Sequence, residues 1–129
     1  MTLLLDTHVW LWLQTSPHRI AAETLQLLED PAHPLVLSAA SVWEITIKHA
    51  LGKLPLPEPP SSFVMLRLTR HGVRALAIEV AHTLAVADLP PLHADPFDRL
   101  LIAQARAERM TLVTADPTVL LYGGPMLRA

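Results

Sequence analysis

The sequence predicts an α/β domain in which a central parallel sheet of four or five short strands is flanked by helices on both sides. Short apolar runs alternate with longer segments whose apolar residues recur at helical spacing, which is typical of βαβ units. The first run, Leu3–Leu5, ends abruptly at Asp6, as expected where a strand buried on both faces reaches a polar edge. A chain of 129 residues suits one such domain, and we expect a single domain over residues 1–129.

The elements of the first half follow from apolar spacing and from helix-ending residues. Residues 7–14 are expected to form a helix that buries Trp10, and a second helix is expected from Pro17 to residue 29. Residues 35–37 form a short apolar run and are predicted to be the second strand. A helix is then expected over residues 39–51, before Gly52.

The second half continues the alternation after an extended surface connection over residues 54–60, in which four of seven residues are proline. The expected elements are a helix over 61–70, a strand over 73–78, a short helix over 79–87, a helix over 97–110, a strand over 111–114 and a last edge strand near residue 126.

Composition excludes several classes of site. Apolar residues make up 51% of the chain and charged residues 17%, which favours a globular domain over a disordered one. The absence of cysteine excludes disulfides, zinc-thiolate sites and thiol nucleophiles, and it favours a reducing compartment. The apolar N-terminus is interrupted by Asp6 and lacks a preceding basic residue, so we expect a cytoplasmic protein without a membrane partner. A net charge of −2 neither predicts nor forbids binding to nucleic acid.

Four carboxylates are predicted to meet at one edge of the sheet. Asp6 and Asp116 follow strands, Glu44 lies in the helix after the second strand, and Asp98 opens the helix before the strand at 111–114. Because ligands of open parallel sheets sit outside the carboxyl ends of the strands, these acids are placed for chemistry.

Helix capping explains each acid taken alone. Asp95 and Asp116 each precede a proline, Ser41 and Glu44 fit a capping box, and Asp6 could itself be a cap. Capping explains the group less well, since Asp98 follows a cap that Asp95 already supplies.

Ionised carboxylates at one edge repel one another unless a cation neutralises them. An all-oxygen ligand set favours Mg²⁺ or Mn²⁺ over zinc. Such an ion can polarise a phosphoryl oxygen and activate water, so the chemistry most naturally served is phosphodiester hydrolysis.

Basic, histidine and aromatic residues give weaker signals. Lys48, Arg99 and, with less support, Lys53 could contact phosphates, although Lys48 and Arg99 could equally pair with Glu44 and Asp98. The histidines show no metal-binding spacing, and only His93, two residues before Asp95, is singled out. Among the tryptophans, Trp10 and Trp43 are expected in the core, and Trp12 is expected to be exposed or to contact a partner.

The motifs LLLDTHVW, SVWEITIKHALGKL, HADPFDRLLIAQA and TLVTAD resemble those of the PIN-domain family, in particular the VapC toxins of bacterial type II toxin-antitoxin systems. The resemblance covers nearly the whole chain, and four motifs in order are more specific than any one of them. It implies a PIN fold and an endoribonuclease that depends on Mg²⁺ or Mn²⁺ and cuts RNA such as tRNA or rRNA. It also implies a VapB-like antitoxin as partner and a homodimer.

Carried over by position, the resemblance makes Asp6, Glu44, Asp98 and Asp116 the catalytic and metal-binding acids. The family acid immediately precedes the apolar helix, which selects Asp98 and leaves Asp95 as a cap or supporting group. Thr7 and Thr114 match hydroxyl positions that could orient water or a carboxylate, and Ala94 replaces a basic residue usual in that motif.

Three alternatives remain open at this point. The chain could be a PIN nuclease that is not a toxin, or a catalytically silent protein-binding module whose acids are helix caps. A phosphatase of the haloacid-dehalogenase type would need a second aspartate where His8 stands.

Overall fold

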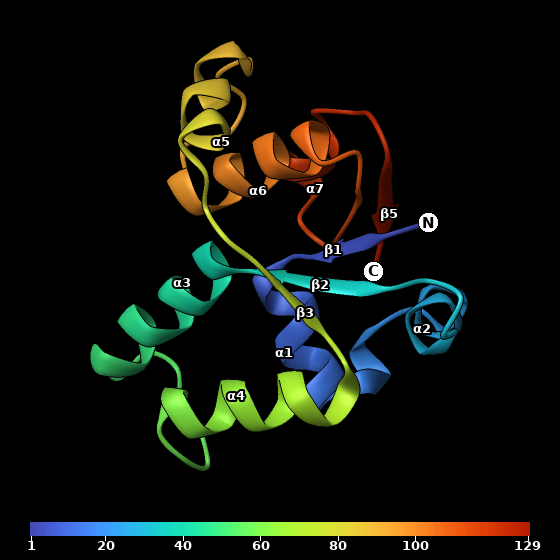
Figure 1. Cartoon of the computed structure of the whole chain (residues 1–129), viewed down its shortest axis with the longest axis vertical. Coiled ribbons are helices and arrows are strands. Elements are labelled where there is room, and N and C mark those ends of the chain that lie inside the picture. The colour runs from blue at the N-terminus through green and yellow to red at the C-terminus, as the bar shows by residue number, and fades with distance from the viewer.

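Five parallel strands form one sheet in the order β3-β2-β1-β4-β5 in the computed structural model, which describes all residues from 1 to 129 (Figure 1). The strands are β1 (Leu3–Leu5), β2 (Leu35–Ser38), β3 (Arg74–Leu76), β4 (Thr111–Thr114) and β5 (Met126–Arg128). The predicted α/β architecture is confirmed, and the tail does supply the last edge strand.

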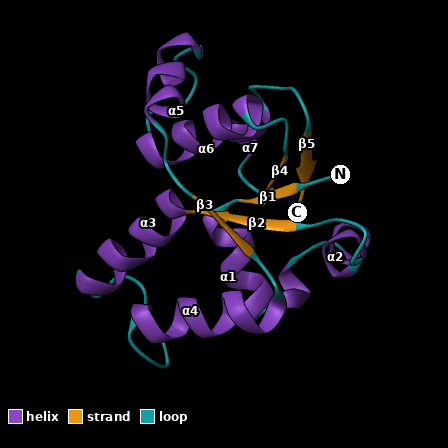
Figure 2. Ribbon diagram, viewed as in Figure 1, coloured by secondary structure: helices purple, strands orange, loops and turns teal.

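Seven α-helices and two short 3₁₀ helices connect the strands (Figure 2). They are α1 (Thr7–Thr15), η1 (Pro17–Arg19), α2 (Ala22–Glu29), α3 (Ala39–Ala50), α4 (Pro60–His71), α5 (Val80–Ala85), η2 (Val86–Asp88), α6 (Pro96–Ala107) and α7 (Pro117–Leu120).

The predicted helix from Pro17 to residue 29 is wrong at its start. Only Pro17–Arg19 is helical there, as a 3₁₀ turn, and α2 begins at Ala22. Ile20 and Ala21 between them adopt extended ψ angles of 135° and 139°. This break lets the Ile20 side chain enter the core, where it is 4% exposed.

The two faces of the sheet carry separate cores because side chains alternate along a strand. Leu3 and Leu5 belong to a cluster with residues of α1, α2 and α4, whereas Leu4 belongs to a cluster with residues of α6 and α7. In Figure 2, α1 and α4 lie on one side of the sheet and α5, α6 and α7 on the other. Since both faces are covered, β1 has no solvent-facing side chain, which accounts for its run of leucines.

Trp43 on α3 does not lie in the core as predicted. It is 59% exposed. The buried residues are Ala40, Ser41, Glu44 and Ile45. The helix therefore turns polar groups inward, toward the carboxyl end of the sheet.

No helix in the structure combines the length and the apolar character needed to cross a membrane.

Candidate active site

A cavity of about 340 Å³ opens at the carboxyl end of the central strands. Five carboxylates line it, together with His8, Trp12, Lys48, His93 and Ala115. The acids are Asp6, Glu44, Asp95, Asp98 and Asp116. The four acids predicted from their positions after strands and at helix starts therefore lie in one cavity, and Asp95 joins them.

Asp6 occupies the N-cap position of α1 but makes no capping hydrogen bond with its side chain. Its carboxylate is buried, with the residue 5% exposed, and Oδ2 accepts a hydrogen bond of 2.7 Å from the Thr114 hydroxyl on β4. The same hydroxyl oxygen accepts the backbone N–H of Asp116 at 3.1 Å. The Thr114 hydroxyl thus fixes the position of the Asp6 carboxylate relative to the backbone of Asp116.

Glu44 is not part of a capping box. The cap of α3 is Ser38, whose hydroxyl accepts the backbone N–H of Ala40 at 3.0 Å, so Glu44 lies in the second turn. Glu44 is 3% exposed; Oε2 pairs with Lys48 Nζ at 2.6 Å, and the buried Oε1 has no partner. An unpaired buried carboxylate oxygen is costly, so Glu44 presents an unused ligand atom beside the cavity.

The Thr7 hydroxyl bonds to another hydroxyl and not to one of the acids. It donates to Ser41 Oγ at 2.9 Å, and both residues are buried. The bond joins the first turn of α1 to α3, so it fixes the backbone that carries Asp6 relative to the helix that carries Glu44.

Asp95 and Asp98, the two neighbouring aspartates between which the sequence had to choose, make different contacts. Asp95 Oδ1 accepts the backbone N–H groups of Phe97 at 2.8 Å and Asp98 at 3.1 Å, so Asp95 caps α6. The Asp98 side chain is free of that role and faces His93, its Oδ2 lying 2.9 Å from Nε2.

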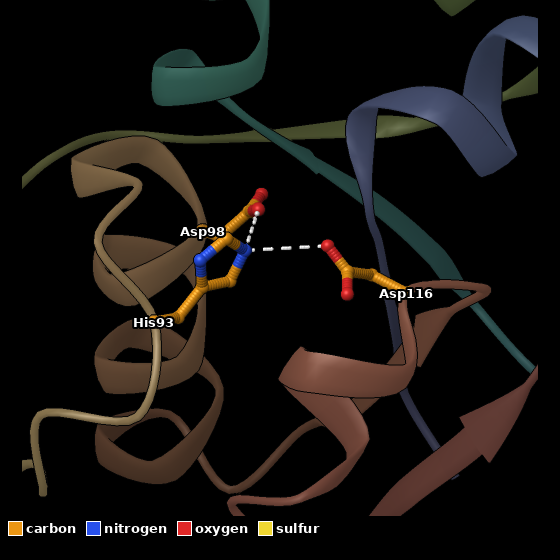
Figure 3. Close-up of side chains that lie close together, drawn as sticks. All are labelled: His93, Asp98 and Asp116. Carbon is orange, nitrogen blue, oxygen red and sulfur yellow. Dashed lines mark hydrogen bonds and ion pairs between the residues drawn. The ribbon is translucent and has the colours of Figure 1, made fainter.

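His93 lies between two of the acids (Figure 3). Its Nε2 is 2.9 Å from Asp98 Oδ2 and 3.2 Å from Asp116 Oδ2. The backbone N–H of Asp95 donates to Nδ1 at 3.4 Å, so Nδ1 is an acceptor and Nε2 carries a proton. His93 therefore donates toward both carboxylates.

Arg99 does not line the cavity and forms no ion pair with Asp98. Its guanidinium donates to the carbonyls of Val86, Pro90 and His93 at 3.1, 3.2 and 3.5 Å. These bonds hold the loop before α6 and, through it, the position of His93. Lys48, the other predicted phosphate contact, does line the cavity.

Burial and mutual repulsion disfavour negative charge in this cavity. Burial, followed by the charges of Asp6, Asp95 and Glu44, raises the pKa of Asp98 from 3.8 to about 7. Burial also raises the pKa of Asp6, although the Thr114 hydrogen bond opposes it. Burial alone would raise the pKa of Asp116, but hydrogen bonds from the Thr118 backbone and His93 bring it below its usual value.

Comparison with known proteins identifies the family of this chain. A model of the PIN domain matches residues 3–121. The chain belongs to the PIN-domain family. Ribonuclease VapC22 of Mycobacterium tuberculosis is 32% identical to it over 116 residues, which cover 89% of this chain and 87% of that protein. Ribonuclease VapC16 of the same organism is 46% identical over 74 residues, and the match spans about half of each chain, 52% in both.

Solved structures confirm the PIN-like fold. VapBC2 from Rickettsia felis, bound to a DNA fragment from its promoter, superposes with a TM-score of 0.74 at 18% identity, covering 99% of this chain and 98% of that one. VapBC-1 from nontypeable Haemophilus influenzae gives a TM-score of 0.67 at 20% identity, covering 100% and 97%.

The acids of this PIN domain fit a hard divalent cation. The donors that line the cavity include carboxylate oxygens, among them the partnerless Glu44 Oε1, and carboxylate oxygens of Asp98 and Asp116 lie within 4.8 Å of each other and of a His93 ring nitrogen. A cation would also relieve the repulsion that raises the pKa of Asp98.

Sequence reasoning missed the contribution of His8 to the cavity wall, singled out Trp12 only as exposed or contacting a partner, and underestimated His93. His8 has a local signal, since it follows Asp6 by two residues, but the contact between His93 and Asp116 spans 23 residues and no local pattern announces it.

The raised pKa of Asp98 makes the stability of the metal-free PIN domain depend on pH. Because the carboxyl group has a pKa of about 7 in the folded protein against an ordinary value of 3.8, the folded state binds this proton more tightly than the unfolded chain. The stability it contributes is fully present below about pH 4 and is lost as pH rises to about 7. In EDTA, the melting temperature of Asp98→Asn should therefore rise relative to wild type over that range and stay higher above it. Thermal denaturation of both proteins at each pH measures the difference, and a difference that does not vary with pH would contradict the assignment.

Proposed function

We propose that this PIN domain is an endoribonuclease dependent on Mg²⁺ or Mn²⁺ and the toxin of a VapBC-like type II toxin-antitoxin module. The observation that carries the proposal is the convergence of Asp6, Glu44 and Asp98 in one cavity, with a buried Glu44 oxygen that no protein donor satisfies. Membership of the PIN-domain family and similarity to two VapC ribonucleases support the same reaction.

Asp6 and Asp98 would be the main metal ligands, with Glu44 and Asp116 completing the site directly or through water. When bound, the ion supplies Lewis acidity, which polarises the phosphate and lowers the pKa of the attacking water. The chain's own contribution is positioning: Thr114 fixes Asp6, the Thr7–Ser41 bond fixes α1 against α3, and Asp95 caps α6.

The reaction is in-line attack of water on an RNA phosphate. Water adds to phosphorus and the bond to the 3′ oxygen breaks, so the products carry a 5′-phosphate and a 3′-hydroxyl. Lys48, at the cavity wall and with its pKa raised by the Glu44 hydrogen bond, stays cationic and is placed to meet a phosphate.

A silent module whose acids are only caps is the main alternative outside the enzyme class. Asp95 and Asp116 do cap helices, since Asp116 Oδ1 accepts the Thr118 N–H at 2.8 Å. Asp6 and Glu44 make no capping bond and are nonetheless buried. A silent module whose acids serve only as caps does not explain why these two carboxylates are buried.

Purified protein should cleave structured RNA such as tRNA or rRNA when Mg²⁺ or Mn²⁺ is present, and EDTA should stop it because the acids then lack their counter-ion. Gel analysis of end-labelled RNA measures cleavage and identifies the 5′-phosphate. Cleavage that persists both in EDTA and in Asp98→Ala would overturn the proposed site.

A VapB-like antitoxin and a homodimer are the partners proposed for this chain. The similar solved structures include VapBC and FitAB complexes, which supports an antitoxin partner. Expression should arrest growth, and co-expression of the adjacent upstream reading frame should relieve the arrest. Cleavage in vitro without growth arrest would instead favour a PIN nuclease that is not a toxin.

A further inference from the structure

A second hollow of about 280 Å³ adjoins the acidic cavity, and the two share His8 and Lys48 in their walls. Three of its seven lining residues are apolar, and two lysines, one histidine and one threonine supply the polar groups. The apolar residues are Leu11, Ile45 and Leu54. A hollow that combines apolar side chains with polar groups offers both kinds of contact that an organic ligand uses.

The end of α3 brings the two lysines of this hollow together. Gly52, with a φ of 73°, donates its N–H to the His49 carbonyl at 3.0 Å, and Lys53 donates its N–H to the Lys48 carbonyl at 2.9 Å. These are the two bonds of a Schellman motif, which requires the left-handed conformation that glycine adopts freely. The turn reverses the chain and returns Lys53 beside Lys48.

Only one of the two lysines has an ammonium group that is not already paired with a carboxylate. Lys48 Nζ is paired with Glu44 Oε2 at 2.6 Å, whereas Lys53 is exposed and forms no ion pair or side-chain hydrogen bond. Five carboxylates in the adjoining cavity repel a polyanion. The free ammonium group of Lys53, which lines the adjoining hollow, is therefore available to counter that repulsion and hold a phosphate.

We propose that this hollow binds the RNA nucleotide next to the scissile phosphate. Lys53, with Lys48 beside it, contacts the phosphate of that nucleotide, and the base packs on the partly exposed Leu11 and Leu54. The inference rests on the proposed ribonuclease function, and it assigns a substrate-binding role to Lys53 and to the turn at Gly52.

Lys53→Gln tests the phosphate contact, and Arg74→Gln is the matched control. Arg74 is an exposed cation on β3 that lines neither hollow and forms no ion pair, so its loss changes the net charge equally. The probe is a fluorescein-labelled single-stranded RNA of about 12 nucleotides, bound in Mg²⁺ by Asp98→Asn protein to prevent cleavage. Fluorescence anisotropy at several salt concentrations gives the affinity and its salt slope.

Lys53→Gln should weaken RNA binding several-fold and reduce the slope of log affinity against log salt by about 0.7, while Arg74→Gln leaves both unchanged. In protein that keeps Asp98, Lys53→Gln should raise KM and leave kcat within about twofold. The reason is that the contact with Lys53 stabilises the bound substrate and the transition state equally. Equal affinity, slope and KM for Lys53→Gln and wild type would overturn the inference. An effect confined to antitoxin binding would also overturn it and would assign the hollow to a protein ligand. Absence of any cleavage by the wild-type protein would instead count against the proposed function.

Discussion

Asp6→Asn is expected to lower the rate of RNA cleavage by at least about 100-fold, because it removes a negative charge from the acidic cavity in which we propose that the metal ion binds. The same change should raise the melting temperature of the metal-free protein. Burial raises the pKa of the Asp6 carboxyl, so keeping it ionised opposes folding, and an amide of similar size removes that cost. Initial cleavage rates and thermal denaturation in EDTA measure the two effects.

Asp88→Asn is the matched control for this experiment. Asp88 ends η2, is exposed, and makes no side-chain hydrogen bond or ion pair, so the same chemical change should alter neither cleavage nor melting temperature. Loss of activity accompanied by a lower melting temperature in Asp6→Asn would mean that Asp6 supports the fold and not the reaction.

Some parts of this fold could be predicted from short stretches of the sequence alone. Strands β1, β2 and β4 are short apolar runs, as expected where both faces of a sheet are covered by helices. Such runs can be recognised in the sequence without knowing the tertiary structure. The position of Asp6 follows, since a residue after a parallel strand lies at the carboxyl edge whatever the rest of the chain does.

Residues whose environment depends on distant contacts could not be placed in this way. Helical spacing alone places Trp43 in the core, but α3 turns Ser41 and Glu44 inward, where the Ser41 hydroxyl meets that of Thr7, 34 residues away in the chain. That rotation leaves Trp43 outside, against Phe97 at 5.2 Å between ring centroids. The choice of Asp98 over Asp95 likewise comes from family resemblance, and the reason for it, the two backbone N–H groups that Asp95 accepts, belongs to the folded loop.

Trp10→Ala is expected to lower the free energy of unfolding by about 3–5 kcal/mol, a large share of the roughly 5–15 kcal/mol typical of such domains. Trp10 is fully buried on α1 and meets the Phe63 ring of α4 edge-on, with 5.8 Å between ring centroids. Its removal leaves a cavity between the helices that cover one face of the sheet. Urea denaturation followed by circular dichroism measures the loss, and Trp43→Ala, at a position 59% exposed, should cost less than about 1 kcal/mol.

Trp10→Phe separates the packing contribution from the polar one. The indole Nε1 of Trp10 is buried without a hydrogen-bond partner, so the wild-type protein already bears the cost of an unsatisfied donor. Phenylalanine keeps an aromatic ring against Phe63 and removes that donor, and the loss of stability should therefore be well below that of alanine. A loss of stability as large for phenylalanine as for alanine would contradict this and would mean that the indole N–H is hydrogen-bonded in solution.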